Sequence, residues 1–427
     1  MRLGWMWMCV LAGMVGAGVA VQGQQASAKR DVLAKPGTVV PAGATYVGSE
    51  SCRGCHTKAY DGWKKTRMAN VVRDPKEHPE AVVADFTHAD PLVTFDLKDV
   101  AFVYGSKWKQ RFFTKRGDDY YAEPAQWDVA KKRWLPYHAE VGADWWVPLY
   151  GASNFERPTG PLCDGCHSVN YNVATKQVTE WNVGCEKCHG PGSEHVKHPL
   201  RTNIVNPEEL DYVRGNDTCI QCHSQGRPIA GAGYNDVGGK HYDWPVGYTA
   251  GDRLADVWKL EELKPGVTNF FQYADMTAHK NRMQGNDFVQ SNMYHRTLRC
   301  FDCHEVHSDA NEANLIAVGN ALCLQCHGAS AKNAAGLRGT VVEHTHHAAG
   351  SKGSECVACH MPKIAITIKD NNVASHTFRF ITPTLTEQSG VPNPCTSCHK
   401  DKDNGWAAKQ LQGWETESPW RMAQPLM

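Results

Sequence analysis

Sixteen of the 17 cysteines in this 427-residue chain form eight Cys-x-x-Cys pairs, and a histidine directly follows each pair. The eight motifs are Cys52-Cys55-His56, Cys163-Cys166-His167, Cys185-Cys188-His189, Cys219-Cys222-His223, Cys300-Cys303-His304, Cys323-Cys326-His327, Cys356-Cys359-His360 and Cys395-Cys398-His399. This spacing is the attachment sequence of c-type haem. Two thiols one helical turn apart can add to the two vinyl groups of a porphyrin, while the following imidazole binds the iron. The sequence therefore predicts eight c-type haems, each with one proximal histidine.

Other uses of paired cysteines explain the pattern less well. Disulfides, zinc sites, thioredoxin-like redox pairs and iron–sulfur clusters do not require a histidine after every second cysteine. Histidine accounts for 21 residues of the chain, so eight such positions by chance have a probability of about one in 10¹⁰. The motifs predict cofactor attachment, and no catalytic residue is assigned from them.

Histidines outside the motifs could supply the second axial ligand of each iron. An iron between two imidazoles suits electron transfer, whereas an open sixth position permits substrate chemistry. His307 follows His304 by three residues, and it could reach a neighbouring haem from the same helical face. A Gly-Pro-Gly turn at 190–192 could direct His195 back over a porphyrin.

Seven histidines are therefore predicted as distal ligands. They are His307, His195, His346, His376, His279, His344 and His295. The cluster at 344–347 is expected to donate one or two of them. For each residue the alternative is a surface histidine or one bonded to a haem propionate.

The N-terminal segment predicts export. Residues 1–28 contain Arg2, no further charged side chain, and an Ala-Ser-Ala cleavage sequence at 26–28, which is typical of a signal peptide. An uncleaved membrane anchor is the alternative, because the apolar stretch is long enough to span a bilayer. Cys9, the cysteine outside the motifs, would leave with a cleaved signal. Haem is attached outside the cytoplasm in bacteria, so we expect the periplasm, the outer surface or an extracellular location.

The charge and hydropathy of the chain exclude two classes of protein. Lys and Arg total 45 and so do Asp and Glu, which leaves no basic footprint for nucleic acid. Mean hydropathy is −0.49, which excludes a polytopic membrane protein. Sixteen haem propionates would make the holoprotein more acidic than this balance suggests.

The motifs divide the chain after the signal peptide into six segments. They are a leader with the first haem (29–91), an aromatic-rich β insert (92–150), a three-haem segment (151–230), a haem-free insertion (231–290), a four-haem segment (291–403) and a tail (404–427). Helices are expected at 49–65, 254–263 and 406–412. Turns at 117–118 and 130–132 predict a small antiparallel sheet in the insert, which either forms a docking surface or buries its aromatics against the first haem.

The predicted fold class is mainly α. Extensive irregular loops are expected to wrap around a stacked multihaem core, with the small antiparallel β insert beside it. The macrocycles supply much of the buried surface, so the chain needs fewer apolar side chains than its length implies.

Three segments resemble a known superfamily of multihaem cytochromes. The segments 46–52 (YVGSESC), 184–195 (GCEKCHGPGSEH) and 356–362 (CVACHMP) are similar to the group containing the tetrahaem cytochrome of ammonia oxidisers, octahaem hydroxylamine oxidoreductases and pentahaem nitrite reductases. Residues 300–327 resemble the doubled CxxCH module of electron-carrier cytochromes. The resemblance covers about residues 46–403 apart from the aromatic insert. It implies stacked haem pairs, a mostly helical chain and a periplasmic or outer-surface role.

The chain departs from that superfamily in two ways. The nitrite reductases use a CxxCK motif at the active haem, and no CxxCK occurs here. Related proteins often have a histidine after the first motif, where this chain has Met68. Histidine–methionine ligation by Met68 would raise the potential of that haem; the alternative is a methionine packed against porphyrin.

Two functions follow from these features. The first is an electron carrier acting between redox partner proteins, such as periplasmic or membrane cytochromes or a quinol-linked donor. The alternative is an octahaem oxidoreductase that acts on a small nitrogen or sulfur compound, such as nitrite or hydroxylamine, at one five-coordinate haem. Abundant histidine and the absence of CxxCK favour the carrier over an enzyme. A homo-oligomer or an extracellular filament is a further arrangement that the sequence leaves open.

Overall fold

The computed structural model describes residues 40–137, 153–229, 242–328, 337, 339–365 and 373–414. The predicted signal peptide, Cys9, His138 and His241 lie outside these residues.

The helices are short, and polar side chains cap many of them. They are α2 (Thr57–Lys64), α4 (Cys185–His189), α5 (Ser193–Lys197), α6 (Tyr212–Ile220), α7 (Gln284–Phe288), α8 (Asn292–His295), α9 (Asn320–His327), α10 (Val341–Thr345), α11 (Cys356–His360), α12 (Pro383–Ser389), α13 (Pro394–Cys398) and α14 (Asn404–Gln412). Asp211, Asn393 and Asp403 each accept a backbone N–H in the first turn of α6, α13 and α14. The expected C-terminal helix is thus present, whereas the helix expected at 49–65 is divided into a 3-10 turn at Ser49–Cys52 and α2.

An antiparallel sheet of five strands forms the β insert, as predicted. Its strands follow the chain order β1 (Val72–Arg73), β2 (Val100–Tyr104), β3 (Lys109–Arg116), β4 (Asp119–Asp128) and β5 (Arg133–Pro136). The register pairs Arg116 with Asp119 and Asp128 with Arg133, so the two predicted turns connect β3 to β4 and β4 to β5.

The two faces of this sheet bury different sets of aromatic side chains. On one face Phe112, Trp127 and Trp134 pack with Phe86 and Phe95. The other face is built around Val72, Tyr104, Phe113 and Ala122, and Cys163 and Trp181 are among the residues packed against it. The sheet therefore packs against the second haem motif rather than the first.

The described residues also contain three two-stranded sheets. They are β6 (Ser168–Val169) with β7 (Glu180–Trp181), β8 (Gly226–Pro228) with β9 (Trp258–Leu260), and β10 (Lys363–Ala365) with β11 (Val373–Ala374). The prediction of a helix at 254–263 is wrong. Leu254–Asp256 forms a 3-10 turn and β9 follows it. In this conformation Leu254 and Trp258 pack against Ile220 of α6.

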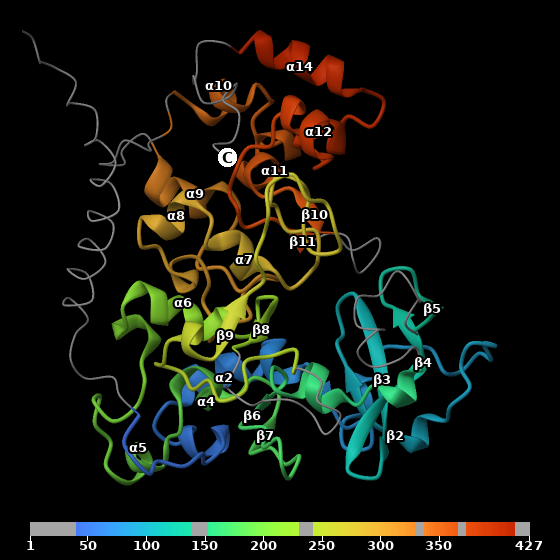
Figure 1. The fold of residues 1–427 in the computed structure, drawn as a ribbon, viewed down its shortest axis with the longest axis vertical. Helices are drawn as coiled ribbons and strands as arrows, with labels where there is room; N and C mark the ends of the chain where they lie inside the picture. Colours follow the sequence, from blue (N-terminus) through green and yellow to red (C-terminus); the bar gives the residue numbers. More distant parts are fainter. Residues whose placement is uncertain are drawn as a thin grey trace, which may run out of the picture.

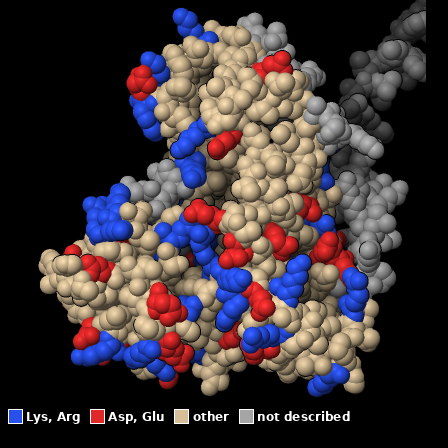
Figure 2. Space-filling view, turned by 180° about the vertical axis from the view of Figure 1, so that it is seen from behind, with Lys and Arg blue, Asp and Glu red and all other residues tan. Residues whose placement is uncertain are grey.

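Helices α9, α10, α11, α12 and α14 lie in an upper lobe, α2, α4 and α6 lie below it, and the five-stranded sheet stands to one side (Figure 1). Residues 300–312 belong to the lower part, because Cys300 contacts Asn216 of α6 and Glu312 pairs with Lys107. In the view of Figure 2, acidic and basic side chains are interspersed, more densely over the lower half than over the upper lobe. Within the described ranges, no helix has the length and apolarity needed to cross a bilayer.

The predicted fold class is confirmed in part. Short helices and small antiparallel sheets alternate along the chain, so helices do not dominate it as the mainly α prediction required. The wrapping of loops around a stacked core remains a prediction.

Candidate metal centres

Each Cys-x-x-Cys-His motif lies in one tight helical turn. In five motifs the histidine lies just beyond the end of a helix or turn, and its N–H donates to the carbonyl of the first cysteine at 2.8–3.1 Å; these histidines are His56, His167, His223, His304 and His399. The other three motifs lie in α4, α9 and α11. Positions three and four apart share a helical face, so the turn presents both thiols and the imidazole on the same side. The sixteen motif cysteines are free thiols, as porphyrin attachment requires.

Four motif histidines face a second imidazole. The ring centroids are 6.2 Å apart for His56 and His195, 6.2 Å for His189 and His307, 6.3 Å for His360 and His344, and 6.2 Å for His399 and His347. Two imidazoles that each bond one metal at about 2 Å have their centroids about 6 Å apart. In each pair one histidine comes from a motif and the other from outside it, which is the arrangement of a proximal and a distal ligand.

In several of these histidines, a backbone carbonyl oxygen lies close to the ring nitrogen Nδ1. Nδ1 of His189 lies 2.7 Å from the carbonyl oxygen of Val205, and Nδ1 of His195 lies 3.0 Å from that of Leu200. An Nδ1–H donated in this way leaves the Nε2 lone pair for a metal. Burial lowers the pKa of His189 below its usual range, which favours the neutral form that a metal binds.

The cluster at 344–347 supplies two of the four partner imidazoles. His344 lies opposite His360, and His347 lies opposite His399. His346, which the sequence favoured, has its ring 4.2 Å from that of Trp414 instead. The reason is local: His346 ends α10 in the left-handed conformation, with φ of 54°, and the chain turns there. One or two ligands were expected from this cluster, but His346 was favoured over His347, because spacing alone does not reveal this turn.

The other predicted distal ligands lie in different surroundings. The ring of His279 is 4.8 Å from Tyr273, and that of His295 is 5.8 Å from Tyr294. His376 is close enough to His304 and His223 for both to lower its pKa, after the larger effect of burial, to about 4.

Met68 is in a 3-10 turn, and its carbonyl accepts a hydrogen bond from Val183. The imidazole that faces His56 comes from His195. The structure therefore brings His195, not Met68, to the predicted sixth position of the first motif.

Cysteines of motifs that are far apart in sequence lie close together. The neighbouring thiols are Cys52 and Cys185, Cys166 and Cys222, Cys219 and Cys300, and Cys323 and Cys356. Burial raises the pKa of Cys188, Cys303 and Cys359, and the neighbouring Cys219, Cys326 and Cys395 respectively raise it further. These contacts put the motifs in the spatial order first, third, fourth, fifth, sixth, seventh, eighth, with the second beside the fourth.

Hydrogen bonds to two carboxylates connect the first motif to the third. Glu186, inside the third motif, accepts the backbone N–H groups of Val47 and Gly48 at 2.8–3.0 Å. Glu180 accepts both the N–H and the hydroxyl of Ser49. The segments 46–52 and 184–195, which carry the resemblance in sequence, are thus in direct contact.

The second motif has a different environment. The ring contact of His167 among the described residues is with Tyr104, at 5.4 Å, and its buried Nδ1 has no hydrogen-bond partner there. Burial and then the cations Arg282, Arg111 and Lys187 lower the pKa of His167 to about 4. Its imidazole is therefore neutral and close to positive charge.

Buried polar groups surround this motif. Asp164 is 2% exposed and accepts hydrogen bonds from Thr159 at 2.8 Å and Tyr104 at 3.1 Å. Burial raises the pKa of Asp164 to about 7. Arg282 pairs with Asp243 at 2.9 Å, while its buried Nε has no hydrogen-bond partner among the described residues. Neither Asp164 nor Arg282 was predicted as a site residue, because neither belongs to a recognisable motif.

Comparisons with known proteins match one segment of the chain by sequence and most of the chain by fold. The family model described as the doubled CXXCH motif matches residues 295–332, which contain the fifth and sixth motifs. In structure, the chain matches the outer cell wall cytochrome OcwA with a TM-score of 0.67 and 22% identity, covering 87% of each chain. The chain therefore contains a doubled CXXCH motif and shares the fold of OcwA. Its thiols and paired imidazoles fit c-type haem as the cofactor.

Two further matches are more distant. The dissimilatory sulfite reductase MccA of Wolinella succinogenes is 23% identical over an alignment of 327 residues, and the match covers 61% of this chain and 41% of MccA. The match thus spans less than half the length of that relative. An undecahaem cytochrome from the S-layer of Carboxydothermus ferrireducens matches with a TM-score of 0.49 and 19% identity, covering 88% of this chain and 60% of that chain.

Proposed function

We propose that this cytochrome is an exported electron carrier with eight covalently bound haems, most of them held between two histidines. Its partners would be other redox proteins, such as periplasmic or membrane cytochromes or a quinol-linked donor. A haem iron between two imidazoles supplies one-electron exchange between Fe(III) and Fe(II). The periplasm or the outer cell surface is the proposed location, and the outer cell wall position named for OcwA supports it.

The observation that carries this proposal is the set of four imidazole pairs. Their separations differ by only 0.1 Å, between 6.2 and 6.3 Å, although the pairs come from different parts of the chain. Two neutral imidazoles satisfy both axial positions of an iron, so such a site exchanges electrons without opening to substrate. We assign His195, His307, His344 and His347 as the distal ligands of the first, third, seventh and eighth motifs.

The spatial order of the motifs supports transport along the molecule. Seven motifs form an unbranched series through their thiol contacts, and the first and eighth stand at its ends. Cys55 and Cys398 at the two ends are exposed, as is Cys326 of the sixth motif. We infer that partner proteins exchange electrons with the cytochrome near these two ends.

Haem counting and EPR together test the proposal. Intact mass and a pyridine haemochrome assay should give eight haems per chain, and EPR of the oxidised holoprotein should give low-spin signals for the paired sites. Fewer than eight attached haems would contradict the octahaem assignment. A high-spin iron at a paired site would contradict its bis-histidine ligation.

A second candidate function rests on the second motif. His167 contacts Tyr104 rather than an imidazole among the described residues, and it is near Arg282, Arg111 and Lys187. An iron with an open position beside buried cations would attract a small anion. This favours an oxidoreductase acting on a small nitrogen or sulfur compound, and the name of MccA, a dissimilatory sulfite reductase, points the same way.

The two candidates differ in one spectroscopic result. Under the second, EPR of the oxidised protein includes one high-spin haem, and sulfite, nitrite or hydroxylamine alters that signal. If every haem is low-spin and unaffected by these compounds, the second candidate fails and the carrier remains.

A further inference from the structure

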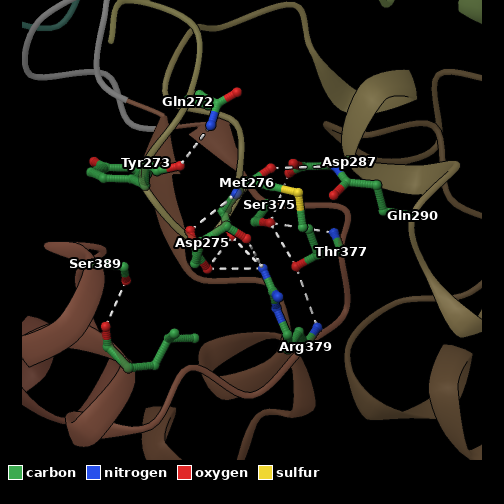
Figure 3. A network of polar contacts seen from close by, with 12 residues as sticks. Gln272, Tyr273, Asp275, Met276, Asp287, Gln290, Ser375, Thr377, Arg379 and Ser389 are labelled. Atoms are coloured by element: carbon green, nitrogen blue, oxygen red, sulfur yellow. Dashed lines mark hydrogen bonds and ion pairs between the residues drawn. The ribbon is translucent and has the colours of Figure 1, made fainter. Parts of the chain in front are cut away.

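A polar network joins two segments that are about one hundred residues apart in the chain. One segment, 275–287, belongs to the haem-free insertion, and the other, 375–379, lies in the four-haem segment. Figure 3 shows Asp275 and Asp287 of the first segment directed toward Ser375, Thr377 and Arg379 of the second. The insertion therefore has a specific contact with the part of the chain that contains His376.

Asp287 is the centre of this contact. Its Oδ2 accepts the hydroxyl of Ser375 at 2.8 Å and the backbone N–H of His376 at 3.0 Å, and its Oδ1 accepts the N–H of Ala278 at 2.8 Å. The side chain is almost fully buried, since Asp287 is 2% exposed. A buried carboxylate is costly unless donors surround it, so this one fixes the backbone at His376 firmly.

The other side of His376 is also held. Arg379 donates to Asp275 at 2.8 Å and to the hydroxyl of Thr277 at 2.7 Å. Toward the N-terminus, Ala374 pairs with Lys363 in the sheet of β10 and β11. Residues 374–379 thus form a strap, a short segment fixed at both ends and, through Asp287, at its middle.

The strap orients two imidazoles. Nδ1 of His376 lies 3.1 Å from the carbonyl oxygen of Ala374, and Nδ1 of the proximal His360 lies 3.2 Å from that of Phe378. Each contact leaves Nε2 for a metal. The motif histidines His304 and His223 are both close to His376.

We propose that Asp287 is a positioning residue that holds His376 as an axial haem ligand. The inference rests on the proposed function, because it requires bis-histidine haems. The haem-free insertion then has a defined role: it supplies the carboxylate that fixes a distal ligand contributed by the four-haem segment.

The test compares spin states in oxidised holoprotein. His376→Ala should convert one haem equivalent from low-spin to high-spin in EPR. Asp287→Asn, which keeps the size of the side chain but replaces one acceptor oxygen with a donor, should convert part of the same equivalent. Added imidazole should return both variants to the low-spin form. Asp287→Ser repeats the measurement if D287N gives little holoprotein.

The matched control is Asp217→Asn. Asp217 is also buried, at 8% exposure, and accepts a backbone N–H from Leu254, but that contact holds no histidine. D217N should leave every haem low-spin. If H376A yields a high-spin haem but D287N and D287S do not, the positioning role is overturned and bis-histidine ligation stands. If H376A changes nothing, both the ligand assignment of His376 and the role of Asp287 are overturned, while the pairs at the other motifs are unaffected.

Discussion

At the first, third, seventh and eighth motifs, a second imidazole lies opposite the motif histidine. At the second motif, the ring of His167 contacts Tyr104 instead. The paired sites have carbonyl oxygens near Nδ1, as at His189 and His360. The buried Nδ1 of His167 has no such partner among the described residues. A carbonyl acceptor raises the basicity of a ligand imidazole, and among the described residues His167 has none.

The difference arises outside the five-residue motif. Partner imidazoles reach the paired sites from other helices and loops, whereas the five-stranded sheet brings Tyr104 to the second motif. Gly165 within that motif lies against Trp244, where a Cβ atom would be 1.9 Å from the indole ring. The surroundings of an attachment sequence therefore depend on which element packs over it.

The largest expected effect is the loss of a paired imidazole. His307→Ala should convert the haem of the third motif fully from low-spin to high-spin, because His307 is the imidazole opposite His189. EPR of the oxidised protein measures this change, and His198→Ala is the control, since His198 is exposed and belongs to none of the four pairs. An unchanged low-spin spectrum in H307A would remove the basis for the paired class.

The second effect is a pH dependence of stability at the second motif. Burial raises the pKa of Asp164 to about 7 from its ordinary value of 3.8. The folded protein therefore holds a proton that the unfolded chain has lost, and the stability from this group is full below about pH 4 and lost as pH rises through about 7. Its size is up to about 4 kcal/mol.

Asp164→Asn should remove that dependence. Urea unfolding of wild type and variant at several pH values gives the difference in free energy, which should fall from pH 4 to 7 and stay constant above. A difference that is independent of pH would show that Asp164 titrates normally in the folded protein.

The third effect concerns the contact between two paired sites. Glu186→Gln loses the charge that accepts the N–H groups of Val47, Gly48 and Gly192, at 2.7–3.0 Å. Hydrogen bonds to a charged group contribute about 1.5–3 kcal/mol, so we expect unfolding to become easier by about 2 kcal/mol.

Glu194→Gln is the matched control, since Glu194 forms a surface pair with Lys197. Such pairs contribute about 0–1 kcal/mol, and urea midpoints should separate the two variants. Equal effects would mean that Glu186 adds no more than a surface charge.

Local and distant features differed in how well the sequence predicted them. The eight motifs and their turns depend on residues at most four positions apart, so their spacing was sufficient. His195 and His307 were also predicted as ligands, but which motif each faces depends on tertiary packing. The choice of His347 over His346 depends on a left-handed residue, and the failed helix at 254–263 on contacts of Trp258 with α6. The cations near His167 come from separate segments, so their proximity could not be predicted from the sequence.

The smallest expected effect is on anion binding at the second motif. Arg282→Gln removes a buried cation near His167, and we expect azide or sulfite to bind the second haem about tenfold more weakly, or about 1.4 kcal/mol. Visible-absorption titration of the oxidised protein measures the affinity. Arg227→Gln is the control, because Arg227 is an exposed residue paired with Glu261 at 3.5 Å. If R282Q binds as tightly as wild type, the cation does not serve an anion site. A further outcome is that wild type binds no anion while H307A does. That result would mean that the second haem has two axial ligands, like the haems at the paired sites. The two kinds of site would then differ in redox potential alone.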